Sequence, residues 1–313
     1  MIQTGRTELS DEEIKRVTRA FLIWTAGELV EPLDTLAAQP HVNAACIRDA
    51  ADGMKSVVSA ATLPFQLTVA AVQQRRFDRH LSAERIRSLK DVPHGEEPSE
   101  EQEKHAFRIA SSKMGKFVGS VEGTNIFRDE VVTELDRSLK GEVISSAAGE
   151  LLIQTLVSTW TIFEHFTSRF IVECVNSDPK RARVLLSVPE LKTYFGKQII
   201  DVETVDEHGF DLTRSMGTVI FNGRRLDNLS ITRCLMEALF GCSEIRDALG
   251  DTLWKLNQRR HLFVHRRGLV DQEYLRRTGD NVLVGQRLIV SSMDIENYLL
   301  AVQRAILVIG KNA

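Results

Sequence analysis

The chain has 313 residues, of which 43% are hydrophobic, and its 40 basic and 43 acidic residues give a formal net charge of −3. This is the composition of an ordinary globular protein, and the length suggests about two domains. The near-neutral balance excludes a protein whose whole surface attracts nucleic acid, so any phosphate binding must come from a local patch.

The cysteines and the N-terminal residues indicate the compartment. The four cysteines form no CxxC pair, and we expect them to be small core residues in a reducing environment. The first 16 residues are polar and lack an apolar signal core. No uninterrupted apolar run reaches about 18 residues, the length of a membrane span. We therefore expect a cytoplasmic protein with no membrane partner.

The first half of the chain predicts helices followed by a connector. Residues 10–38 begin with Ser10 as an N-cap, which is followed by acidic residues in the first turn. Apolar residues then recur at helical spacing, and helix-like sequence continues to residue 90. Residues 91–104 contain two prolines and a cluster of glutamates, and 105–141 contain four glycines. The sequence thus predicts an N-terminal helical region over 1–90 and a linker or weak connector over 91–141.

The second half predicts an antiparallel helical bundle over 142–313. A long amphipathic helix covers 142–176, and shorter helices follow up to residue 265. Residues 274–290 carry β-branched residues around turn signals, which favours a small hairpin or extended arm. A last helix is expected from Ser292 to about Ile309. The fold class is therefore all-α, with one short extended or β-hairpin insertion.

The strongest motif is RRHLFVHRRG at residues 259–268, at the end of an expected helix. His261 and His265 are four residues apart, so on a helix they share one face. Arg260 falls instead on the apolar column with Leu253 and Leu256, where it needs a partner or must reach the rim. A guanidinium in that position is an unusual choice for a purely structural residue.

The six residues from Arg260 to His265 resemble the RxxxxH signature of HEPN domains, in which the residue after the arginine is Asn, Asp or His. The earlier segment Trp160-Thr-Ile-Phe-Glu164-His-Phe is similar to the helix that packs beside the motif helix in that family. The resemblance covers about residues 142–311 and leaves the first 140 residues unexplained.

The resemblance implies a HEPN-like helical bundle and an endoribonuclease that needs neither metal nor another cofactor. It implies a homodimer in which two copies of the motif meet across a two-fold axis to form one cleft. Proteins with this signature commonly act in bacterial toxin–antitoxin or anti-phage systems, so an antitoxin or sensor partner is expected beside the RNA substrate. The expected products carry a 2′,3′-cyclic phosphate and a 5′-OH.

The residue types suit this chemistry. RNA supplies its own nucleophile, the 2′-OH, so the protein must provide only proton transfer and charge stabilisation. We expect His265 to be the general acid or base, His261 to orient the substrate or the partner histidine, and Arg260 to clamp the phosphate. Glu164 is the candidate that pins Arg260. Sequence-independent attraction of the RNA backbone is expected from Arg259, Arg266 and Arg267.

Two other interpretations stay open. The histidine pair could ligate zinc, although the sequence supplies no third ligand nearby. The basic helix end could instead belong to a non-catalytic helical module that binds RNA, a nucleotide or a protein partner. Arginines in the last turn of a helix also complement its dipole, which explains part of the motif without RNA.

Overall fold

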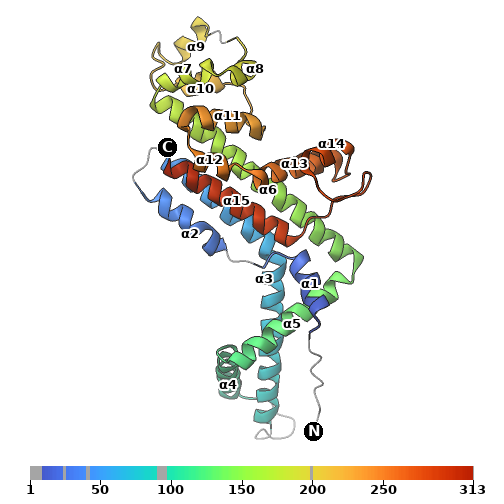
Figure 1. Cartoon of the computed structure of the whole chain (residues 1–313). Coiled ribbons are helices and arrows are strands. Elements are labelled where there is room, and N and C mark those ends of the chain that lie inside the picture. Colours follow the sequence, from blue (N-terminus) through green and yellow to red (C-terminus); the bar gives the residue numbers. More distant parts are fainter. Residues whose placement is uncertain (1–8, 24–25, 40–42, 90–96, 198–199, 313) are drawn as a thin grey trace. The chain divides into compact units, whose positions relative to one another are not determined.

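The computed structural model confirms the all-α class (Figure 1). It describes residues 9–23, 26–39, 43–89, 97–197 and 200–312. Within these ranges the only β-type pairing is an isolated antiparallel bridge between Leu269 and Arg287.

The chain divides into two compact units whose boundaries differ from those expected. One unit comprises residues 1–23 and 62–148, and the other comprises 24–61 and 149–313. Helices α3 (Ala44–Ser88) and α6 (Glu142–Ser177) each contribute to both units. The N-terminal region is divided because α2 (Ala26–Ala37) packs against the last helix of the chain.

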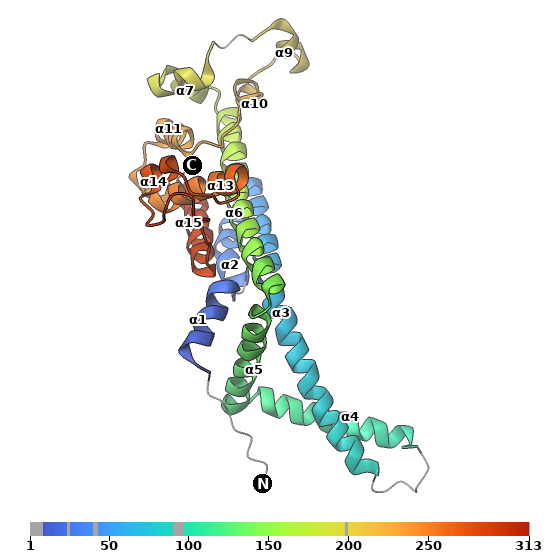
Figure 2. The ribbon, with the colours of Figure 1, turned by 90° about the vertical axis from the view of Figure 1, so that its right-hand side faces the viewer.

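The first unit contains the expected connector, which is mostly helical. Helix α4 (Glu100–Val118) begins at a capping box on Ser99, and α5 (Val121–Leu139) follows almost directly (Figure 2). Gly123 permits this close turn, because a Cβ there would lie 1.9 Å from the carbonyl oxygen of Phe117. Two of the glycines that suggested a weak helix, Gly119 and Gly123, thus lie at the turn between two regular helices. Residues 91–96 of the expected linker lie outside the described residues.

An apolar cluster holds the first unit together. Helix α1 (Asp11–Ala20) packs against α5, and the Arg16 side chain donates to Asp136 at 2.7 Å. The buried members of the cluster are Val17, Phe21, Val72, Val131, Leu135 and Ala148.

The second unit is built around α6 and α15 (Ser292–Lys311). Helix α15 packs against α2, α12 (Ser243–Ala248) and α13 (Asp251–Arg266). The aromatic side chains of α6 form much of the core, and four of them are almost fully buried: Trp160, Phe163, Phe166 and Phe170. The predicted apolar positions of the last helix are likewise buried: Leu299, Val302, Ile306 and Ile309.

Short helical segments follow α6 in the second unit. They are α7 (Lys180–Ser187), a 3-10 turn (Pro189–Leu191), α8 (Lys192–Phe195), α9 (Val202–Glu207), α10 (Met216–Phe221) and α11 (Leu229–Phe240). Arg224 ties two of them together, because its guanidinium donates to the carbonyl oxygens of Tyr194 at 2.6 Å and Ile220 at 3.0 Å.

The expected hairpin at 274–290 does not form. Residues Gln272–Thr278 are helix α14, because Asp271 caps them and accepts a hydrogen bond from the Tyr274 amide at 2.7 Å. The extended segment that follows returns to the end of α13, where the Leu288 amide donates to the carbonyl oxygen of Gly268 at 2.8 Å. Capping chemistry at Asp271 therefore outweighs the β-branched pattern.

The turn that closes α13 requires glycine at position 268. Its φ is +79°, and an added Cβ would lie 2.6 Å from the Phe263 ring. Its amide donates to the Leu262 carbonyl oxygen at 3.2 Å, which ends the helix directly after the histidine motif.

Gly268→Ala is expected to lower the free energy of unfolding by about 2–4 kcal/mol, because it adds both backbone strain and a clash with Phe263. Gly285→Ala is the matched control: its φ of +84° gives the same strain, but nothing lies within 4 Å of the added Cβ. Urea unfolding of both variants measures the difference. Equal losses in the two variants would contradict the packing of Phe263 on this turn.

Candidate functional site

Helix α13 presents the two histidines together at its surface. His261 and His265 are both exposed, and their ring centroids are 4.5 Å apart with the ring planes inclined by 51°. The apolar side chains of the same helix, including Leu262 and Phe263, are buried. Packing of that face fixes the helix and leaves the histidine column open.

Arg260 points toward α6, where it meets Glu164. The distance between its Nη2 and Glu164 Oε2 is 3.9 Å, so the expected contact is present as a loose ion pair. The fully buried Trp160 donates from Nε1 to the same carboxylate oxygen at 3.0 Å. Glu164 is therefore held from one side and holds Arg260 from the other.

The Arg260 guanidinium is only partly satisfied by the protein. Its Nε is buried and has no hydrogen-bond partner within the described part of the chain. The side chain is 23% exposed, so other N–H donors reach solvent. A cation oriented by one distant carboxylate keeps donor capacity for an anion.

A cavity of about 560 Å³ brings Arg260, His261 and His265 together. Trp254, Asn257 and Gln258 line it from the same helix. The remaining lining residues are Arg277 of α14 and three residues at the start of α11: Asp227, Asn228 and Ser230. One chain thus places two histidines and a guanidinium around a single space.

The cations around the cavity change the titration of His261. Partial burial lowers its pKa below the ordinary value, and the nearby His265, Arg260, Arg277 and Arg266 lower it further. The neutral imidazole is therefore favoured near neutral pH, and a neutral imidazole can accept a proton.

Arg259 has a different environment from that expected. It is 13% exposed and donates to Asp294 at 2.8 Å and to Asp280 at 3.1 Å. Burial alone would raise the pKa of Asp280, but the Tyr274 hydroxyl and Arg259 outweigh it and lower the pKa. Arg259 is thus the more buried of two cations, with Lys255, in a network between α13, α15 and the segment after α14. Since its donors are engaged, we exclude it from the proposed RNA contacts.

Arg266 and Arg267 lie at the end of α13 and are exposed. Arg266 pairs with Asp271 at 2.7 Å and also lines a smaller neighbouring cavity that includes His261. Arg267 is the C-cap residue, with a left-handed backbone. Neither lines the cavity of about 560 Å³, but both are exposed to a polyanion at the end of the helix.

Several residues of the cavity lie outside the RRHLFVHRRG motif. Trp254, Asn257 and Gln258 repeat at helical spacing with His261 and His265, so the helical period could have identified them. Asn257 and Gln258 are buried and linked: Gln258 Nε2 donates to Asn257 Oδ1 at 3.1 Å. Asp227 and Arg277 come from distant segments, and no pattern in the sequence joins them to the motif.

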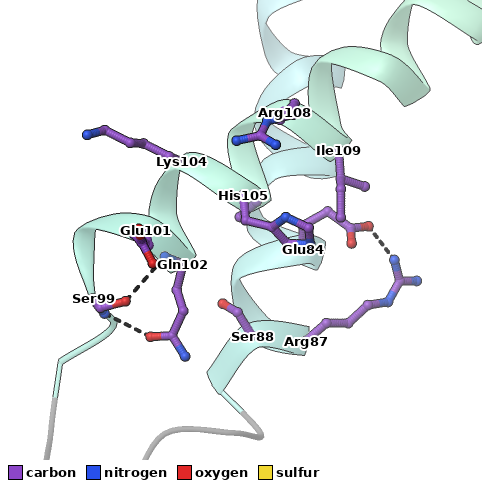
Figure 3. A pocket seen from close by; sticks show the side chains of 11 residues that line it. Glu84, Arg87, Ser88, Ser99, Glu101, Gln102, Lys104, His105, Arg108 and Ile109 are labelled. Atoms are coloured by element: carbon purple, nitrogen blue, oxygen red, sulfur yellow. Dashed lines mark hydrogen bonds and ion pairs between the residues drawn. The ribbon is translucent and has the colours of Figure 1, made fainter.

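A larger cavity of about 830 Å³ lies in the first unit, between the end of α3 and α4 (Figure 3). It mixes acidic and basic side chains, and several of these are paired: Glu84 accepts from Arg87, and Lys104 pairs with Glu100 at 2.6 Å. It contains one histidine, His105. The cavity lined by His261 and His265 is therefore the better candidate for proton-transfer chemistry.

The described residues include no cluster suited to a metal ion and one helix of membrane-spanning length. Among the described residues, no group of three or more His, Cys, Asp and Glu side chains is placed to hold a metal ion. One described helix, α3, is long and apolar enough to cross a membrane by length and composition, a criterion that buried core helices also meet. The compartment and the lack of a membrane partner stay predictions.

Comparison with known proteins gives no match to a family model, a curated protein or a solved structure. Function is therefore inferred from the residues of the site.

The two neighbouring arginines are expected to respond differently to substitution. Arg259→Gln removes the partner of two carboxylates and should lower the free energy of unfolding by about 2–4 kcal/mol. Arg260→Gln removes a loose, partly exposed ion pair and should cost less than about 1 kcal/mol. Chemical denaturation of both variants measures this. A larger loss for Arg260→Gln would show that Arg260 is the structural residue.

Proposed function

We propose that the protein is an endoribonuclease that cleaves RNA by attack of the 2′-OH and uses no metal ion. The observation that carries the proposal is the convergence of Arg260, His261 and His265 on one cavity. The sequence resemblance to the RxxxxH signature agrees with this chemistry and supplies the expectation that metal is not required.

The geometry suits a division of the proton transfers between the histidines. The 2′-oxygen attacks the adjacent phosphorus, the bond from phosphorus to the 5′-oxygen breaks, and the products are a 2′,3′-cyclic phosphate and a 5′-OH. His261, whose lowered pKa favours the neutral form, would accept the 2′-OH proton. His265 would donate a proton to the leaving 5′-oxygen. His261 thus receives a proton-transfer role beyond the orienting role expected from sequence.

Charge stabilisation would come from Arg260. The phosphoryl group gains negative charge in the transition state, and a guanidinium held in place stabilises that charge. Glu164 is a positioning residue, because it touches Arg260 and is itself held by Trp160. Arg266 and Arg267 would attract neighbouring phosphates without regard to sequence.

A homodimer is also proposed, with the two motifs meeting at a two-fold axis. Three apolar side chains around the end of α13 are exposed: Val264 at 49%, Leu269 at 52% and Ile289 at 85%. A second copy of the chain would cover them and bring its own histidines close. Action in toxin–antitoxin or anti-phage defence, with the first unit receiving a trigger, an antitoxin or a sensor partner, rests on the resemblance alone.

Arg260→Ala and His265→Ala are each expected to reduce cleavage of single-stranded RNA by at least about 100-fold, because each removes a group used in the transition state. Cleavage by the unsubstituted protein should persist in EDTA. Arg183→Ala, an exposed arginine of α7 outside the cavity, is the matched control and should retain activity.

Mixing the two inactive variants tests the dimer. If one site uses groups from both chains, subunit exchange should restore part of the activity, whereas independent sites would stay inactive. A protein that binds RNA and never cleaves it at high concentration would favour the non-catalytic binding module. Loss of activity in EDTA that Zn²⁺ restores would favour the zinc site.

The pH profile should show the lowered pKa of His261. Cleavage needs this residue neutral, so the rate rises with pH through its pKa, and the acidic limb lies below the ordinary histidine value of about 6.5. Arg277→Gln removes one of the cations that lower this pKa and should shift the limb to higher pH. Arg276→Gln is the control, since Arg276 also pairs with Glu273 but does not line the cavity. If the pH profile of Arg277→Gln matched those of Arg276→Gln and the unsubstituted protein, His261 would not be the proton acceptor.

A further inference from the structure

The cavity has a second wall that the cleavage chemistry does not use. Trp254 forms part of it, and Asp227, Asn228 and Ser230 form the remainder. The volume of about 560 Å³ lies within the range typical of sites for whole organic ligands, about 300–1,000 Å³. The space therefore exceeds what a phosphate group alone needs.

Trp254 is fixed in its orientation. Its Nε1 donates to the carbonyl oxygen of Arg277 at 3.1 Å, which ties the ring to the end of α14. The Arg233 guanidinium lies 5.9 Å from the ring centre, and its Nε donates to the carbonyl oxygen of Leu249 at 2.6 Å. Trp254 also lines the cavity, so a base held there would stack on its indole. Unpaired RNA bases are commonly held on aromatic rings in this way.

Asp227 is an acidic residue in a cavity whose other lining residues are basic or neutral. It is an exposed carboxylate with no ion-pair partner among the described residues, beside a site for a polyanion. Its carbonyl oxygen accepts from the buried Asn257 Nδ2 at 3.2 Å, which sets its position relative to α13. A carboxylate repels phosphate and only accepts hydrogen bonds. It matches a base edge with two adjacent donors, which guanine offers at N1–H and N2–H.

We propose that this wall binds the base on the 5′ side of the cleaved bond, with Trp254 stacking on it and Asp227 accepting from the guanine edge. The inference rests on the proposed function and adds a substrate class: single-stranded RNA, cleaved on the 3′ side of guanosine. The nucleotide whose 3′-phosphate meets Arg260 would place its base against Trp254.

Binding of 3′-nucleotides tests the inference without cleavage. Guanosine 3′-monophosphate added to the full-length protein should quench tryptophan fluorescence and bind more tightly than the adenosine, cytidine and uridine 3′-monophosphates. Trp254→Phe should remove most of the fluorescence change. Trp254→Ala should weaken binding, measured by calorimetry, by about 5- to 100-fold.

Asp227→Asn should abolish the preference for guanosine in binding and in the mapped cleavage sites. Asp206→Asn, an exposed carboxylate of α9 outside the cavity, is the matched control and should keep it.

Two outcomes would overturn the inference and leave the proposed function intact: cleavage of RNA without detectable binding of any 3′-nucleotide, or equal binding of all four. Selective binding of guanosine 3′-monophosphate by a protein that cleaves no RNA would uphold the base site and reject the cleavage proposal.

Discussion

The helical period of α13 is the constraint on which the site depends. Successive residues of a helix point about 100° apart, so three neighbouring side chains face three different surroundings. Arg259 turns toward the carboxylates of α15 and of the segment after α14. Arg260 meets Glu164 of α6 and also lines the cavity, and His261 faces the cavity. The same period places His265 above His261. A one-residue shift of this helix would put the wrong arginine in each environment.

That constraint explains why adjacent arginines have opposite roles. The Arg259 network joins three segments, and loss of Arg259 removes the most buried cation beside two half-buried carboxylates. Arg260 has only a loose ion pair, and its buried Nε lacks a hydrogen-bond partner among the described residues. Burial and the cations gathered around His261 lower its pKa and favour the neutral imidazole, and the same cations prepare the cavity for an anion.

The sequence predicted part of this arrangement. Periodicity predicted the helices and the buried face of α15, and the motif predicted the meeting of Arg260 with Glu164. The motif placed Arg259 among the RNA-binding residues, because Asp280 and Asp294 come close to it only in the folded chain. The connector was underestimated, since Gly123 marks a tight turn between two helices rather than a weak helix. Likewise, Asp227 joins the cavity through tertiary packing that no local pattern encodes.

The central claim is that Arg260 and the two histidines catalyse internal attack by the RNA 2′-oxygen. The most direct measurement is mass spectrometry of the ends formed when the purified protein cleaves a defined oligoribonucleotide in EDTA. The account predicts a 2′,3′-cyclic phosphate on one product and a 5′-hydroxyl on the other. Products with a 3′-hydroxyl and a 5′-phosphate, or an intact oligonucleotide at high protein concentration, would contradict it.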